Sequence, residues 1–237
     1  SGQVFEEFRD VPEHYEDRQW THVIEPFDIP IGWTICRSYD FGYSKPFSCA
    51  WWAVDYDGRL YRILELYGCT QTPNEGVKWT PQEQFKRIHE IETQHPWLKG
   101  RKIIGVADPA IWKAESGESV ADVAAQHQVY FDKGDNERIA GWMQLHYRLA
   151  FDGNGIPMMY IFRNCKAFIR TIPLLVYDEH KVEDIDTTQE DHVADETRYE
   201  CMSRPIRPQR PEVHEKIMDD PLNQRVHRQH AKFIPHG

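Results

Sequence analysis

The spacing of apolar positions along the chain predicts a series of strands followed by alternating helices and strands. Residues 33–40, 48–54 and 60–66 are rich in β-branched and aromatic residues, and Asp57-Gly58 between the last two is typical of a hairpin turn. Residues 103–107 form a short apolar run before Asp108-Pro109, which indicates a buried central strand. We expect two further strands at 129–131 and 158–162.

The helical segments begin with recognisable start signals. Thr80-Pro81-Gln82-Glu83 combines an N-cap, a proline in the first turn and a capping-box residue, and His95-Pro96 marks the end of this helix. Further helices are expected near 119–126, 136–149, 166–176 and 191–199. Three consecutive strands followed by alternating helices and strands predict an α/β protein, with a mixed central β-sheet flanked by helices.

Proline-rich and charged segments suggest three parts in the chain. Residues 1–30 are polar and contain Pro26 and Pro30, so we interpret them as a linker or hinge arm. Residues 31–203 would form the folded domain. Residues 204–237 are basic and proline-rich, which predicts an extended or disordered tail.

Composition excludes several classes of protein. The formal net charge is −10, from 28 Lys and Arg against 38 Asp and Glu, which argues against a surface that coats nucleic acid everywhere. The five cysteines are scattered without a CxxC pair, so we expect reduced thiols and no zinc site. No apolar stretch is long enough to span a membrane and no signal peptide is visible, so we expect an intracellular protein without a membrane segment. The P-loop, GxGxxG, HExxH and GxSxG motifs are also missing from the sequence.

Three aspartates stand at positions where a site could form. Asp40 and Asp108 end predicted strands, and Asp195 lies on a late helix. Carboxylates that meet at the carboxyl edge of a sheet suit hard divalent cations, and two such ions can promote phosphodiester cleavage. Each acid also has a structural interpretation: a turn residue for Asp40, a helix N-cap for Asp108 and an exposed helical acid for Asp195.

Three strings of residues resemble one family. They are Arg37-Ser38-Tyr39-Asp40-Phe41-Gly42-Tyr43, Gly105-Val106-Ala107-Asp108-Pro109 and Asp191-His192-Val193-Ala194-Asp195-Glu196-Thr197-Arg198-Tyr199. In order and spacing they are similar to the C-terminal nuclease domain of phage terminase large subunits. The segments 135–142 and 24–27 also resemble this family, the latter its hinge from the motor domain.

This resemblance implies an RNase H-like fold and a metal-dependent endonuclease that cuts concatemeric viral double-stranded DNA with little sequence specificity. It makes Asp40, Asp108 and Asp195 the catalytic ligands of two divalent cations, Mg²⁺ or Mn²⁺. It also implies an ATPase domain upstream and outside this chain, a terminase small subunit and a portal protein as partners, and a location in the host bacterial cytoplasm.

The late motif leaves several roles open. Glu196 stands where the family usually has a small residue, so it either faces solvent or adds a fourth acid to the cluster. Asp191 is either a helix cap or an accessory metal ligand. His192 either packs against the domain or orients a water or carboxylate beside the metals.

Positive side chains near the acids are candidate DNA contacts, although each could equally be a solvated surface charge. They are Lys45, Lys113, Lys133, Arg138 and Arg198. The alternative to a nuclease is a non-catalytic module that docks DNA or a portal within a packaging motor. A resolvase or integrase of the same fold is a further alternative, but the late helix motif and the hinge-like segment argue against it.

Overall fold

A mixed β-sheet forms the centre of residues 2–114 and 116–208, the part of the chain that the computed structural model describes. Its seven strands lie in the order β1-β7-β4-β3-β2-β5-β6. The β2–β3 and β3–β4 pairs are antiparallel, and the other neighbours are parallel. The strands are β1 (Val23–Ile24), β2 (Thr34–Asp40), β3 (Ser48–Val54), β4 (Leu60–Tyr67), β5 (Ile103–Ala107), β6 (Asp132–Lys133) and β7 (Met159–Phe162).

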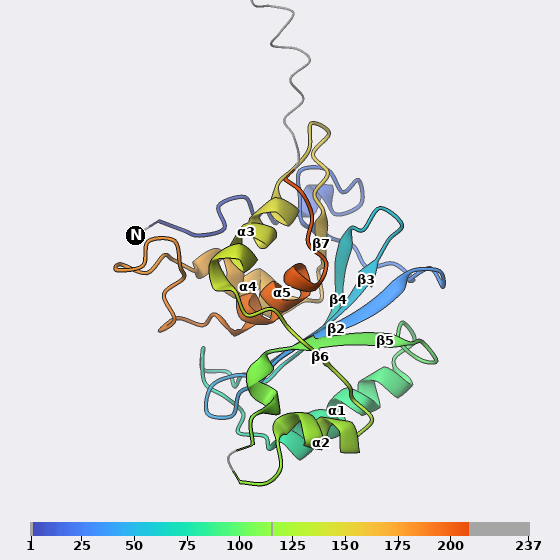
Figure 1. The fold of residues 1–237 in the computed structure, drawn as a ribbon. Coiled ribbons are helices and arrows are strands. Elements are labelled where there is room, and N and C mark those ends of the chain that lie inside the picture. The colour runs from blue at the N-terminus through green and yellow to red at the C-terminus, as the bar shows by residue number, and fades with distance from the viewer. Residues whose placement is uncertain (1, 115, 209–237) are drawn as a thin grey trace, which may run out of the picture. The chain divides into compact units, whose positions relative to one another are not determined.

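Helices cover both faces of this sheet (Figure 1). One face carries α3, α4 and α5, and the other carries α1 and α2. The α-helices in the described ranges are α1 (Pro81–Gln94), α2 (Val120–Gln126), α3 (Arg138–Leu149), α4 (Lys166–Thr171) and α5 (His192–Ser203), with short 3₁₀ turns η1 (Pro12–His14), η2 (Pro109–Trp112) and η3 (Ile172–Leu174). The expected α/β architecture, a mixed sheet flanked by helices, is confirmed.

Local signals in the sequence explain several of these elements. Thr80 and Glu83 form the predicted capping box, with the Thr80 hydroxyl accepting from the Glu83 N–H. The β3–β4 turn closes on the Asp55 carboxylate, which accepts the N–H groups of Asp57 and Arg59 at 2.9 Å each. Gly58 adopts φ +79 there, a conformation that glycine reaches without a steric cost.

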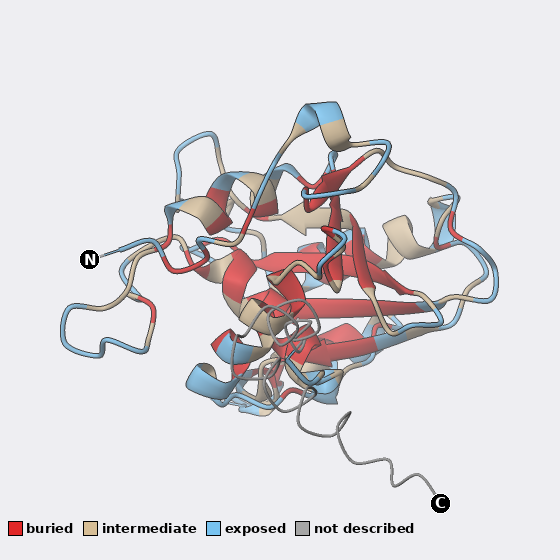
Figure 2. Cartoon of the chain, turned by 90° about the horizontal axis from the view of Figure 1, so that it is seen from above, coloured by how far each residue is buried: buried red, intermediate tan, exposed pale blue. Residues whose placement is uncertain are grey.

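Alternating residues of the central strands separate the two halves of the core. On β2, Tyr39 faces α1 and donates to Gln84, while Ser38 faces α5. On β3, the indole N–H of Trp51 donates to Glu92 of α1, and that of Trp52 donates to Ser38 on the opposite face. Both tryptophans are fully buried, so both belong to the core. Figure 2 shows that buried residues follow the central strands and that exposed residues lie on loops and outer helix surfaces.

A buried ion pair joins α5 to the sheet. Glu196 receives Arg62 of β4 at 2.8 and 3.0 Å, and both side chains are 0% exposed. The hydroxyls of Ser38 and Ser48 also donate to the Glu196 carboxylate, at 2.6 and 2.9 Å. Glu196 therefore neither faces solvent nor adds to the acidic cluster, which answers the question that the sequence left open.

The N-terminal segment from Gly2 onward is part of the folded unit, which among the described residues extends to Arg207. Val4, Phe5 and Phe8 are buried, and β1 adds a parallel strand beside β7. From the sequence we interpret residues 1–30 as a linker or hinge arm, and the described residues of this segment pack against the rest of the domain. The apolar residues of this segment have no helical or strand-like spacing, because the backbone that carries them into the core is irregular.

Two smaller predictions differ from the structure. The sixth strand is at 132–133 rather than 129–131, because Val129 is buried at the end of α2 instead. The helix predicted at 166–176 ends at Thr171 and continues only as η3, where Pro173 lies in the first turn.

The predicted tail from residue 204 is only partly described, because residues 209–237 lie outside the described ranges. Its first residues are bound to α3: Gln144 exchanges hydrogen bonds with the backbone of Ile206 at 2.8 and 3.2 Å, and Arg148 donates to the Arg204 carbonyl. Among the described residues, every helix is too short or too polar to cross a membrane.

We expect Glu196→Gln to destabilise the protein by about 3–5 kcal/mol, because it leaves the Arg62 charge buried without a counter-charge. Urea denaturation followed by circular dichroism measures this loss. The matched control is Glu90→Gln, which breaks the exposed Arg87–Glu90 pair and should cost under about 1 kcal/mol. Equal losses in the two variants would contradict the anchoring role of Glu196.

We expect Phe5→Ala to cost about 3–5 kcal/mol of unfolding free energy, because the ring is fully buried and packs edge-on against Trp142. The control is Tyr56→Ala, whose side chain is 84% exposed and whose loss should change the stability little. An unchanged free energy of unfolding in Phe5→Ala would show that the N-terminal segment does not stabilise the domain.

Candidate functional site

Asp40 and Asp108 lie side by side at the carboxyl edge of the sheet. Asp40 is the last residue of β2, and Asp108 follows β5, the parallel neighbour in which Ala107 pairs with Tyr39. Asp108 also caps η2, because one of its oxygens accepts the Ala110 N–H at 2.8 Å. The capping interpretation of Asp108 is therefore correct. Its second oxygen takes no part in the cap, so Asp108 can also belong to a cluster with Asp40.

Asp195 reaches the same edge from the first turn of α5, which packs across β2, β3 and β5. Because successive residues of a helix point in different directions, the side chains of Asp195 and Glu196 leave α5 on different faces. Glu196 enters the core, while Asp191, Asp195 and Arg198 share a face toward the sheet edge. The buried Glu196 anchor thus sets the rotation of α5 that presents Asp195.

The charges of these acids act on one another. Burial raises the pKa of Asp40 well above its usual value, and the charges of Asp195, Asp108 and Asp191 raise it further, against the influence of Arg198. Burial and then the Asp195 charge raise the pKa of Asp191 to about 7, with Arg138 and Arg198 opposing. The other three aspartates that the sequence singled out therefore lie near enough for their charges to act on Asp40.

Two arginines hold Asp195 by one of its two oxygens. Its Oδ1 accepts from Arg138 Nη1 at 3.2 Å and from Arg198 Nη2 and Nε at 3.1 and 3.3 Å. The Arg198 side chain is only 1% exposed and lies over the rings of Trp142 and Tyr199. Its predicted role as a DNA contact does not fit this burial, so we assign Arg198 to the positioning of Asp195.

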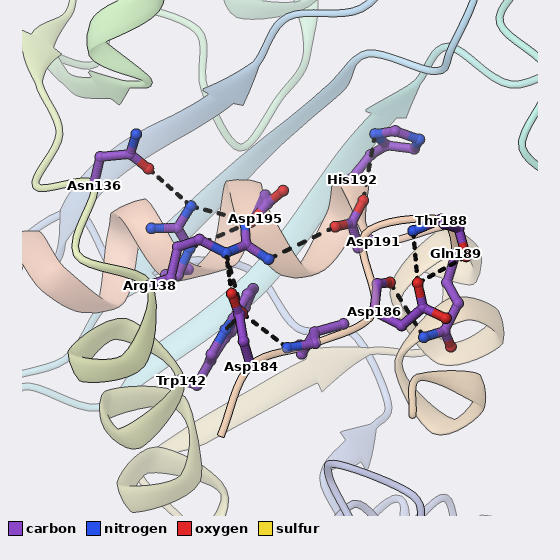
Figure 3. Close-up of polar contacts among 12 residues, drawn as sticks. Asn136, Arg138, Trp142, Asp184, Asp186, Thr188, Gln189, Asp191, His192 and Asp195 are labelled. Carbon is purple, nitrogen blue, oxygen red and sulfur yellow. Dashed lines mark hydrogen bonds and ion pairs between the residues drawn. The ribbon is translucent and has the colours of Figure 1, made fainter. Parts of the chain in front are cut away.

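Arg138 lies between α5 and the loop that precedes it, as Figure 3 shows. Its Nε donates to both oxygens of Asp184 at 3.0 and 3.1 Å, and its Nη2 lies 4.0 Å from Asp191 Oδ2. The guanidinium also stacks over Trp142, whose indole N–H binds the same Asp184. Arg138 is thus surrounded by three carboxylates.

The two residues that begin the late motif have different surroundings. Asp191 occupies the N-cap position of α5 but forms no side-chain cap hydrogen bond; its buried carboxylate faces Arg138 instead. His192 contacts Asn74 Oδ1 through Nε2 at 2.8 Å, and burial holds its pKa below the usual value. His192 therefore lies between the loop that carries Asn74 and the acidic cluster, since its Nδ1 is 3.9 Å from Asp191 Oδ1 (Figure 3).

A groove of about 450 Å³ adjoins the cluster. Asp40 and Asp108 line it together with Phe41 and Lys113, and Phe41 is 37% exposed. Lys45 is exposed in the loop after Asp40, and its charge lowers the pKa of His192 at the start of α5. Lys133 lies over the Trp112 ring, with its Nζ 5.6 Å from the ring centroid.

Sequence reasoning missed several residues of this site. The Tyr199 hydroxyl donates to Asp108 Oδ2 at 3.0 Å, Asn136 Oδ1 accepts from Arg198, and Asp184 binds Arg138. Tyr199 could have been found, because it lies four residues after Asp195 on the same helix face. Asp184 lies in an irregular loop rich in acids, where spacing gives no signal.

The acidic cluster suits a hard divalent cation by its donor chemistry. Its ligands would be carboxylate oxygens, and the mutual repulsion that raises the pKa of Asp40 is of the kind that a cation relieves. Within the described ranges, no three His, Cys, Asp or Glu side chains are already grouped as a metal site.

Comparison with known proteins identifies the fold. No protein-family model matches the chain, and no curated protein matches it. The structure is similar to the P22 large terminase nuclease domain, with a TM-score of 0.62 and 19% identity over 86% of this chain and 93% of that one. It is also similar to the large terminase of the thermophilic bacteriophage D6E, with a TM-score of 0.63 and 20% identity over 85% of this chain.

The chain spans only 44% of the D6E protein. A third similar structure is the large terminase nuclease of the thermophilic phage G20c with bound cobalt, with a TM-score of 0.54 and 10% identity over 84% of this chain and 96% of that one. Over most of its length, this chain therefore has the fold of the phage large terminase nuclease domains.

Proposed function

We propose that this chain is the nuclease domain of a viral genome-packaging terminase, which cuts concatemeric double-stranded DNA. One observation carries the proposal: Asp40, Asp108 and Asp195, on three separate elements, bring their charges together at one sheet edge in a fold shared with terminase nuclease domains. The protein would act in the host bacterial cytoplasm with an ATPase domain outside this chain, a terminase small subunit and a portal protein.

Asp40, Asp108 and Asp195 would hold two divalent cations, Mg²⁺ or Mn²⁺, with Asp191 as an accessory ligand. When bound, such cations supply a nucleophilic water and stabilise the charge that develops on the leaving oxygen. The G20c structure with bound cobalt supports divalent-cation use in a protein of this fold. His192 contacts Asn74 through Nε2, and its Nδ1 lies 3.9 Å from Asp191 Oδ1, so its proposed role is to orient the Asp191 carboxylate.

The chain itself contributes rigid positions for these carboxylates. Arg198 binds Asp195 from within the core, and Tyr199 binds the second oxygen of Asp108. Asp40 stands at the end of a strand that is paired on both sides. Because these supports are buried or part of the sheet, the ligands keep their places when substrate arrives.

DNA would enter along the groove beside Asp40 and Asp108. Lys45 and Lys113 lie near this edge and can meet phosphates, whereas the net charge of −10 opposes binding over the rest of the surface. Lys133 and Arg138 are further candidates at the margin. Phosphate contacts carry no base information, which fits cutting with little sequence specificity.

We expect the purified chain to nick and linearise supercoiled plasmid with Mn²⁺ or Mg²⁺ and to lose this activity in EDTA. Asp40→Asn and Asp195→Asn should each abolish cleavage, because each removes a ligand charge. Agarose-gel cleavage measures the outcome, with circular dichroism to confirm folding.

The control for these variants is Asp57→Asn, an acid in the distant β3–β4 turn whose side chain is 81% exposed. It should cut like the wild type. Folded protein that binds DNA but never cuts it with any cation would refute the nuclease and favour a non-catalytic docking module.

We expect Lys45→Gln and Lys113→Gln each to weaken DNA binding and to lower the slope of log affinity against log salt by about 1, as for the loss of one phosphate contact. Fluorescence anisotropy with duplex DNA in Ca²⁺ measures this. Lys181→Gln, in the loop after η3, is the matched control. Unchanged salt slopes in both groove variants would show that these lysines contact water and not DNA phosphates.

A further inference from the structure

Arg138 and Arg198 both bind Asp195 Oδ1, but they differ in freedom to move. The Arg198 side chain is 1% exposed and is enclosed by two aromatic rings. The Arg138 side chain is 28% exposed, and its Nη2 is buried without a hydrogen-bond partner in the described part of the chain. Arg198 Nη1 is also buried without a partner there, so the two guanidinium groups differ in exposure and enclosure rather than in hydrogen bonding.

The charges at the cluster also single out Arg138. When ionised, Asp40, Asp108, Asp191 and Asp195 carry four negative charges, and without cations the two arginines are the positive groups acting on Asp195 and Asp191. Two divalent cations would bring four positive charges by themselves. With Arg198 fixed in the core, the charge of Arg138 then becomes surplus and is repelled.

Asp184 provides a place for the displaced group. It binds Arg138 Nε through both carboxylate oxygens, and this contact does not involve Asp195 or Asp191. The guanidinium is a rigid plane, so Arg138 would give up its Nη1 contact with Asp195 by pivoting as a whole about its Nε contact with Asp184, beside the Trp142 ring (Figure 3).

We propose that Arg138 is an exchangeable counter-charge of the acidic cluster: it neutralises Asp195 and Asp191 in the cation-free protein and is displaced from Asp195 when divalent cations bind. This inference rests on the proposed function, because it assumes that the cluster binds cations. Arg138 is a regulatory group in this scheme and not a catalytic residue, and it sets the cation concentration at which the site fills.

The first test measures Mn²⁺ binding to the whole chain by titration calorimetry, without DNA. Arg138→Gln should bind Mn²⁺ at least about fivefold more tightly than the wild type, the order expected when one partly exposed competing charge is removed. Arg138→Lys keeps the charge but loses the contacts of the planar guanidinium with Asp184 and Trp142, so its affinity should lie between those of the wild type and Arg138→Gln. Arg87→Gln, the same change in an exposed pair on α1, should leave the affinity unchanged.

The second test uses the unmutated protein and so does not depend on the folding of a variant. In nitrogen-15 NMR at low temperature, the Arg138 Nη–H signals, assigned by their loss in Arg138→Lys, should shift as Mg²⁺ is added, because Nη1 leaves Asp195. The Arg138 Nε–H signal should move much less, because its contact with Asp184 is retained.

The outcomes separate the inference from the proposed function. Wild-type protein that binds Mn²⁺ and cuts DNA, with equal or weaker Mn²⁺ binding by Arg138→Gln or unmoved Arg138 Nη–H signals at saturating Mg²⁺, would overturn the inference alone. Wild-type protein that neither binds Mn²⁺ nor cuts DNA would overturn both.

Discussion

The buried Arg62–Glu196 pair is the contact on which the site depends. Two charges taken out of water are tolerated only where hydrogen bonds satisfy them, and here Ser38 and Ser48 complete the set around Glu196. These four residues come from β2, β3, β4 and α5, so the network fixes the helix across three strands. With Glu196 held in the core, the next face of α5 presents Asp195 to the ends of β2 and β5.

The acidic cluster shows how a fold can keep like charges together. Asp40 and Asp108 are held by strand ends that pair with each other, and Asp195 is held by a helix, so none of them can move away without breaking regular structure. Burial, and then the repulsion between these charges, raises the pKa values of Asp40 and Asp191. Arg198 and Arg138 reduce this repulsion from one side, with one arginine locked in the core and the other at the margin.

Much of the fold could be predicted from local sequence because the signals there are local. The Thr80 capping box, the Asp57-Gly58 turn and the apolar run at 103–107 each specify their own element within a few residues. Local spacing carries no signal for the N-terminal segment, whose structure depends on packing against distant elements. Phe5 and Phe8 lie in an irregular segment, and they are buried because Phe5 packs against Trp142 and Phe8 packs against Phe168.

The same division applies to the site. The sequence by itself determined which aspartates stand at element ends, because short-range patterns specify where strands and helices begin and end. Those aspartates are Asp40, Asp108, Asp191 and Asp195. Only the tertiary structure decided that Glu196 turns into the core, that Arg198 is buried and that Asp184 meets Arg138 across 46 residues of chain. These outcomes depend on which faces of distant elements pack together, and burial and charge pairing between such elements have no signature in local spacing.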